Sequence, residues 1–81
     1  MSLDTLQPGQ TGVVIQLDVD EALLQRLKAF GLVPGTAVSC CYRSPDKSVT
    51  ALRFRGTVLA LRTKDLRRIR VRCLPSLVSS I

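Results

Sequence analysis

Short runs of alternating apolar and polar residues constrain most strongly what this chain can fold into. The clearest run lies late in the chain, where Ile69, Val71 and Cys73 share one face and three arginines share the other. A two-residue period of this kind predicts a strand with one buried face. Four further runs, separated by glycine, proline or polar segments, predict four more strands. They cover residues 12–17, 36–42, 49–55 and 57–62.

The same alternation sorts side chains into faces. In the second predicted strand, the face of Val38, Cys40 and Tyr42 is the better candidate for the core. The run over residues 57–62 is apolar on both faces, so the pattern leaves open which of them points inward.

One amphipathic helix of about ten residues is predicted between the first two strands. Asp18 and Asp20 are candidate N-caps, and Gly31 can end the helix because it adopts a positive φ without steric cost. Four apolar residues recur at helical spacing: Leu23, Leu24, Leu27 and Phe30. Thr63 is expected to cap one further helical turn before the last strand.

A chain of 81 residues allows one small domain. Five short strands with one helix between the first two predict a mainly β fold, a small and strongly bent barrel. The longest unbroken apolar run has four residues, against the ~20 that a membrane-spanning helix needs. The first residues lack the basic and apolar regions of a secretory signal, so we expect a cytoplasmic protein.

The residue types present argue against catalysis. Histidine is absent, which removes the commonest general base and the usual nucleophilic triads. The three cysteines, Cys40, Cys41 and Cys73, are an odd number and are expected to be reduced. Neighbouring residues of a strand point to opposite faces, so Cys40 and Cys41 are poorly placed to share a metal ion. We therefore expect no enzyme, no metal site and no cofactor.

Positive charge is concentrated in one segment. The chain has a net charge of +6, and residues 53–72 hold eight basic residues and one acidic residue. Arginine suits bidentate contact with carboxylate or phosphate, so Arg68, Arg70 and Arg72 are candidates for binding an anionic partner. The alternative is a charged strand edge that only prevents aggregation. Nucleic acid is a weaker candidate partner, because two of the three aromatic side chains are expected in the core.

The last eight residues form an apolar tail. Its apolar side chains fall at i, i+3, i+4 and i+7, the spacing of one helical face: Leu74, Leu77, Val78 and Ile81. We expect this face to dock on its own barrel or on a second copy in a homodimer. The alternative is an end that is ordered only by crystal packing. The predicted organisation is a barrel domain over residues 1–73 and a tail over residues 74–81.

The segment from Arg26 to Thr36 reads Arg-Leu-Lys-Ala-Phe-Gly-Leu-Val-Pro-Gly-Thr, with Leu-Gln-Pro-Gly upstream and Arg-Gly, Leu-Ala-Leu-Arg and Ile-Arg-Val downstream. This order resembles the ferrous iron transport protein A (FeoA) family over roughly residues 3–72. Two departures are evident. Phe30 stands where methionine is usual, and could fill the same core site, while the loop after Pro45 lacks the usual glycine and second proline.

The resemblance implies an SH3-like β-barrel and a non-enzymatic cytoplasmic accessory of bacterial ferrous iron uptake, with the GTPase domain of a FeoB-type transporter as its partner. The surface expected to bind this partner lies near Arg43 and Pro45 and along the arginine strand. Two alternatives remain at this point: a small basic nucleic-acid-binding barrel, and the similar barrel domain that is appended to metal-dependent repressors. No helix-turn-helix is evident in the sequence, which argues against repression.

Overall fold

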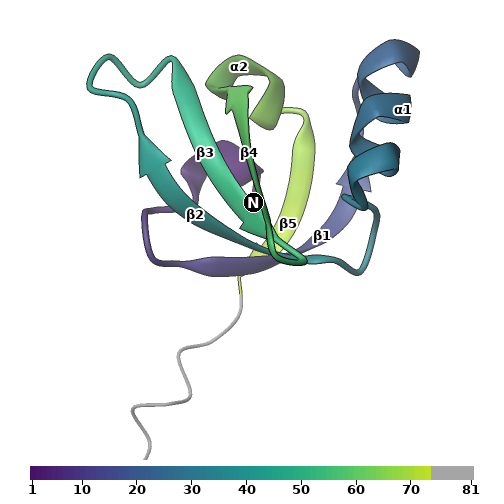
Figure 1. The fold of residues 1–81 in the computed structure, drawn as a ribbon, viewed down its shortest axis with the longest axis horizontal. Coiled ribbons are helices and arrows are strands. Elements are labelled where there is room, and N and C mark those ends of the chain that lie inside the picture. The colour runs from purple at the N-terminus through teal and green to yellow at the C-terminus, as the bar shows by residue number, and fades with distance from the viewer. Residues whose placement is uncertain (74–81) are drawn as a thin grey trace, which may run out of the picture.

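The computed structural model describes residues 1–73, and the predicted apolar face of Leu74, Leu77, Val78 and Ile81 lies outside the described residues. Figure 1 shows the order of the elements. They are η1 (Leu3–Thr5), β1 (Thr11–Leu17), α1 (Glu21–Phe30), β2 (Ala37–Arg43), β3 (Val49–Phe54), β4 (Thr57–Arg62), α2 (Thr63–Leu66) and β5 (Ile69–Cys73). Among residues 1–73, no helix combines the length and the hydropathy that a membrane span requires.

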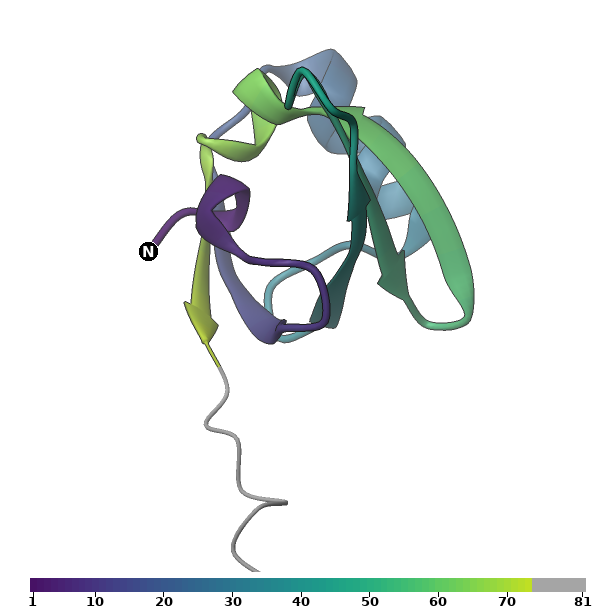
Figure 2. The same cartoon turned by 90° about the vertical axis from the view of Figure 1, so that its left-hand side faces the viewer.

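The five strands form one antiparallel sheet in the order β4-β3-β2-β1-β5. The sheet bends strongly around a common interior without closing, and Figure 2 shows α1 outside that interior. Twelve buried apolar side chains fill the core: Leu3, Leu6, Val14, Leu27, Leu32, Val38, Cys40, Leu52, Phe54, Leu66, Ile69 and Val71. The predicted mainly β fold, with five strands and one helix between the first two, is confirmed.

Two β-bulges decide which side chains of β1 and β2 reach the core. The register between β1 and β5 shifts between Val14 and Gln16, so that Gln16 is exposed instead of following Val14 inward and Leu17 packs against the core. The register between β2 and β3 shifts between Cys40 and Tyr42, and Tyr42 is 57% exposed. An extra residue in one strand interrupts the alternation of its faces. The expectation that Tyr42 shares the core face of Cys40 is therefore wrong.

Helix α1 ends at Gly31 as predicted, and of the two candidate N-caps the structure selects Asp20 rather than Asp18. The carboxylate of Asp20 accepts a hydrogen bond from the Leu23 backbone N–H at 2.8 Å, and Gly31 closes the helix at φ 93°. The expectation that Phe30 fills a core site is wrong, because its side chain is 45% exposed. The fully buried Leu27 and Leu32 occupy the core at this end of the helix.

The structure also settles the orientation of β4. Leu59 and Leu61 are half-buried against the core, whereas the alternate residues of β4 are exposed. The short helix α2 follows, with Arg62 at its N-cap and no side-chain cap. Thr63 is therefore not the capping residue, and its hydroxyl lies 3.0 Å from that of Thr50.

Arg43 ties the N-terminal segment to the sheet. Its Nη2 donates to the backbone carbonyls of Asp4 at 2.8 Å and Leu6 at 2.7 Å. Its Nε lies 3.4 Å from the hydroxyl of Thr50. Because Leu6 is fully buried, these bonds hold η1 against the core.

The loop between β2 and β3 is organised around one carboxylate. Asp46 Oδ1 accepts from the hydroxyls of Ser44 at 2.7 Å and Ser48 at 2.8 Å, and from the Ser48 backbone N–H at 3.1 Å. These bonds, that of Ser44 first, lower the pKa of Asp46 from 3.8 to about 2. Lys47 in the same loop has a positive φ of 64°.

We expect Arg43→Ala to lower the free energy of unfolding by about 2 kcal/mol, because it removes charge-assisted hydrogen bonds from two carbonyls of the N-terminal segment. Urea denaturation measures this change. The matched control is Arg53→Ala, since Arg53 is exposed on β3 and its removal should cost less than about 0.5 kcal/mol. Equal effects of the two substitutions would show that the Arg43 bonds add nothing.

We also expect the Asp46 carboxyl to titrate near pH 2 in a nuclear magnetic resonance experiment. Its pKa is lower in the folded state than the ordinary 3.8, so it stabilises the fold above about pH 4 and this contribution is lost as the pH falls toward 2. Ser48→Ala should raise the Asp46 pKa, and Asp46→Asn should remove this part of the pH dependence. An unchanged titration in Ser48→Ala would contradict the hydrogen-bond origin.

Candidate functional site

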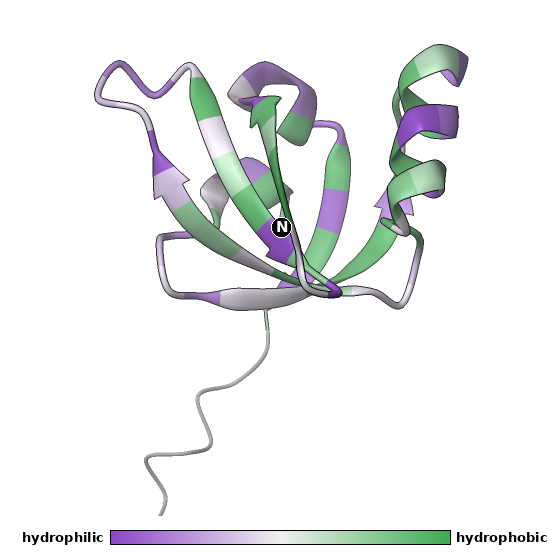
Figure 3. Ribbon diagram, in the orientation of Figure 1, coloured by the Kyte–Doolittle hydropathy of each residue, from purple (hydrophilic) through white to green (hydrophobic). Residues whose placement is uncertain are grey.

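The strand β5 presents arginines on a fixed scaffold. Ile69 and Val71 are fully buried, while Arg70 and Arg72 are exposed on the opposite face. Figure 3 shows this alternation along β5. β1 pairs with one edge of the strand, and on the other edge the Val71 N–H donates to the carbonyl of Met1 at 2.8 Å. Both edges are thus engaged, so the two arginines extend from a well-anchored strand.

Arg68 precedes β5 and already contacts Asp18 of the same chain. Its Nε donates to the Asp18 carbonyl at 2.9 Å, and its Nη2 lies 3.9 Å from the Asp18 carboxylate. The exposed Arg68–Asp18 pair contributes little to stability. Arg67 lies 3.6 Å from the carboxylate of Asp4, whose side chain is mostly buried. Within residues 1–73, Arg70 and Arg72 take part in no ion pair, so their charge is not locally neutralised.

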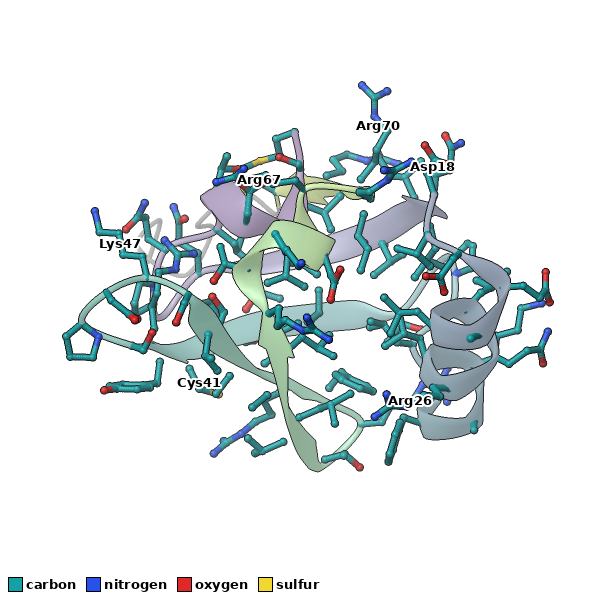
Figure 4. All side chains as sticks on the ribbon, turned by 90° about the horizontal axis from the view of Figure 1, so that it is seen from above. Asp18, Arg26, Cys41, Lys47, Arg67 and Arg70 are labelled. Atoms are coloured by element: carbon teal, nitrogen blue, oxygen red, sulfur yellow. The ribbon has the colours of Figure 1, made fainter. Side chains whose placement is uncertain are left out.

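A shallow hollow of about 360 Å³ lies beside β5. Three guanidinium groups and one carboxylate surround it, from Arg67, Arg68, Arg70 and Asp18. Figure 4 shows Arg67, Arg70 and Asp18 at the same end of the molecule, with Arg70 pointing away from the barrel. Guanidinium groups donate hydrogen bonds and keep their charge at all ordinary pH values, so this hollow is suited to binding anions rather than to proton transfer.

A second hollow of about 360 Å³ lies between the β2–β3 loop and α2. It is lined by Lys47, Ser48, Val49, Arg62, Thr63, Lys64 and Arg67, which include four cations and no acidic side chain. Arg67 lines both hollows and therefore joins the β2–β3 loop to the arginine strand. We call six of the exposed cations on this surface the basic band: Lys47, Lys64, Arg67, Arg68, Arg70 and Arg72.

The residues predicted for partner binding have different surroundings. Pro45 is exposed in the β2–β3 loop, one end of the basic band. Arg43 is half-buried, and its guanidinium donates hydrogen bonds to backbone carbonyls of the same chain. Arg67 was not among the residues predicted from the sequence to bind a partner. Its position next to Arg68, within the positively charged segment, could have indicated it. The structure thus shifts the candidate surface from Arg43 to Arg67.

The cysteines diverge as predicted: Cys40 is buried, Cys41 is exposed and Cys73 is half-buried. Burial raises the pKa of the Cys40 thiol, which disfavours the thiolate that would ligate a metal ion. In the part of the chain that the structure describes, no three histidine, cysteine or acidic side chains are grouped to hold a metal ion.

The expectation that two of the three aromatic side chains face the core is wrong. Phe54 is buried, but Phe30 and Tyr42 are exposed. Neither exposed ring lies on β5, so the arginine strand itself carries no aromatic platform for stacking bases.

Comparisons with known proteins agree on the family. A family model for the FeoA domain matches residues 1–73. The FeoA protein of Chlorobium tepidum has a similar structure, with a TM-score of 0.89 at 25% identity over 93% of this chain and 71% of that chain. The zinc-complexed FeoA of Stenotrophomonas maltophilia, described as an SH3 domain protein, has a TM-score of 0.77 at 25% identity over 88% of each chain.

A manganese-dependent transcriptional repressor shares the fold, with a TM-score of 0.80 at 19% identity over 91% of this chain and 41% of that one. A search of curated protein sequences finds no match. The SH3-like barrel expected from the sequence is confirmed. With the family model matching nearly the whole chain, this protein belongs to the FeoA domain family.

Proposed function

We propose that this chain is a non-enzymatic accessory of ferrous iron transport that binds the cytoplasmic GTPase domain of a FeoB-type transporter. Family membership over residues 1–73 supports the role in ferrous iron transport. The related Stenotrophomonas maltophilia protein carries the description of a candidate ferrous iron transport activating factor. An accessory acts by binding, so the proposal depends on a surface rather than on a catalytic group.

One observation carries the choice of surface. Arg70 and Arg72 extend from a strand that is anchored on both edges, and in residues 1–73 neither has an acidic partner. A partner that binds an arginine already in an ion pair must first displace the carboxylate of that pair. Arg70 and Arg72 are in no ion pair within residues 1–73, so carboxylates of a partner can contact them directly. The basic band therefore fits an acidic protein surface. Complementary charge of this kind accelerates association and makes it sensitive to ionic strength.

Arg70→Glu with Arg72→Glu should weaken binding to the purified GTPase domain by about tenfold or more at low salt. Both side chains are exposed, so folding should be nearly unchanged. The charge-matched control is Arg53→Glu with Lys28→Glu, two exposed cations outside the basic band. Calorimetry at two ionic strengths measures the affinities.

Equal affinity of both double variants would remove the basic band from the proposal. Tight binding of DNA, without any binding of the GTPase domain, would favour the nucleic-acid alternative over the accessory role.

We expect this chain to fold without a bound metal ion. We expect the thermal midpoint to be the same with and without a chelator, because the three cysteines occupy sites of different burial. Differential scanning calorimetry tests this expectation. A chelator-induced drop of about 5 °C or more would reveal a structural metal.

A further inference from the structure

The outermost strand of the sheet, β4, leaves one edge unpaired. Among the described residues it pairs only with β3. Figure 2 shows β4 as the last strand, with no strand beyond it. The other outer strand, β5, is covered by the first residues of the chain, through the bridge between Ser2 and Arg70. The two ends of the sheet therefore differ, and within residues 1–73 the β4 edge is the one left open.

The register identifies the backbone groups at this open edge. Arg62 lies opposite Val49, and the Thr63 N–H donates to the Ser48 carbonyl at 2.9 Å. Since bonded and non-bonded pairs alternate along an antiparallel ladder, Thr57, Leu59 and Leu61 bond to β3. The N–H and C=O groups of Val58 and Ala60, and the N–H of Arg62, consequently point away from the sheet.

A groove of about 490 Å³ runs beside this edge, between β4, α1 and α2. The half-buried side chains of Leu23 and Leu61 give it an apolar part. Arg26, Arg62 and Lys64 line it together with two acids. The acids are Asp20, whose carboxylate caps α1, and Asp65, so the lining has three cations and two carboxylates.

We propose that the β4 edge accepts an extended acidic segment of a partner protein as an additional strand. The free backbone groups of β4 would pair with it, as in other cases of strand addition. The side chains of the partner segment that face inward would be apolar and pack on Leu23 and Leu61. The side chains of the segment that face outward would be acidic and contact Arg62, with Arg26 on the opposite side of the groove. A segment with alternating valine and glutamate has this pattern.

A second copy of this chain fits the edge less well. Each copy carries a net charge of +6, and two β4 edges would bring their cations together. The acidic segment instead complements the cations of the groove. The groove shares Lys64 with the basic band but includes neither Arg70 nor Arg72, so the inference does not rest on the proposed function.

The experiment titrates the isotopically labelled chain with a blocked six-residue peptide of alternating valine and glutamate, the length of β4. We expect saturable shifts centred on β4 and slower hydrogen exchange at the amides of Ala60 and Arg62. The control is the same peptide with methyl groups on the backbone nitrogens that would face β4. This peptide keeps its charge but cannot donate hydrogen bonds to β4, so it should not bind. A valine and lysine peptide should also fail to bind.

Substitutions in β4 provide the second arm. Ala60→Pro removes one outward N–H, at an edge position where proline is tolerated, and should weaken peptide binding about tenfold. Its matched control, Ala60→Thr, keeps the N–H and should bind as the original chain does. Arg62→Glu should weaken binding of the acidic peptide, whereas Arg70→Glu with Arg72→Glu should leave it unchanged.

Several results would overturn the proposal: no binding of the acidic peptide, equal binding of the methylated peptide, or shifts confined to β5. Protection of the Ala60 amide in the chain alone, accompanied by a dimer in sedimentation, would assign the edge to a second copy instead. If Ala60→Pro does not fold, the methylated peptide decides.

Discussion

The rest of this structure depends on the need to bend one sheet around a very small core. Twelve buried apolar side chains must be enclosed by five short strands, α1 and the short helices η1 and α2. The bulges in β1 and β2 allow the necessary curvature, because an extra residue bends its strand and increases the local twist. β1 can then pair with β2 on one edge and with β5 on the other. The same bend leaves β4 at an open end of the sheet, beside α1.

Arginine has two different uses in this domain, and its surroundings decide between them. Arg43 donates inward to the carbonyls of Asp4 and Leu6 and so joins the N-terminal segment to the sheet. Arg70 and Arg72 alternate with buried residues and extend outward without an ion pair in the described chain. The guanidinium chemistry is the same in both cases, but a satisfied inner arginine stabilises the fold, whereas an unpaired outer one is available to a partner.

The two surfaces that we propose differ in the physics of recognition. The basic band offers charge on a firm scaffold, and binding there should depend strongly on salt. The β4 edge offers backbone hydrogen bonds beside a mostly polar groove with an apolar part at Leu23 and Leu61, and binding there should depend on whether the partner can adopt an extended conformation. A partner with both an acidic surface and an extended acidic segment could occupy the two together, which would raise the effective concentration of each contact.

The sequence by itself determined the fold class, the C-terminal end of α1 and the outward arginines of β5. These features follow from local rules: a two-residue period along β5 and a glycine that ends the helix. The choice of Asp20 over Asp18 as the N-cap of α1 came from the structure. Tertiary structure alone decided the outward orientation of Gln16 and Tyr42, because a bulge depends on the neighbouring strand and leaves no signature in the strand that contains it. It also decided the inward role of Arg43 and the place of Arg67 between two hollows. Those roles arise from contacts between residues distant in the chain, which a local pattern does not encode.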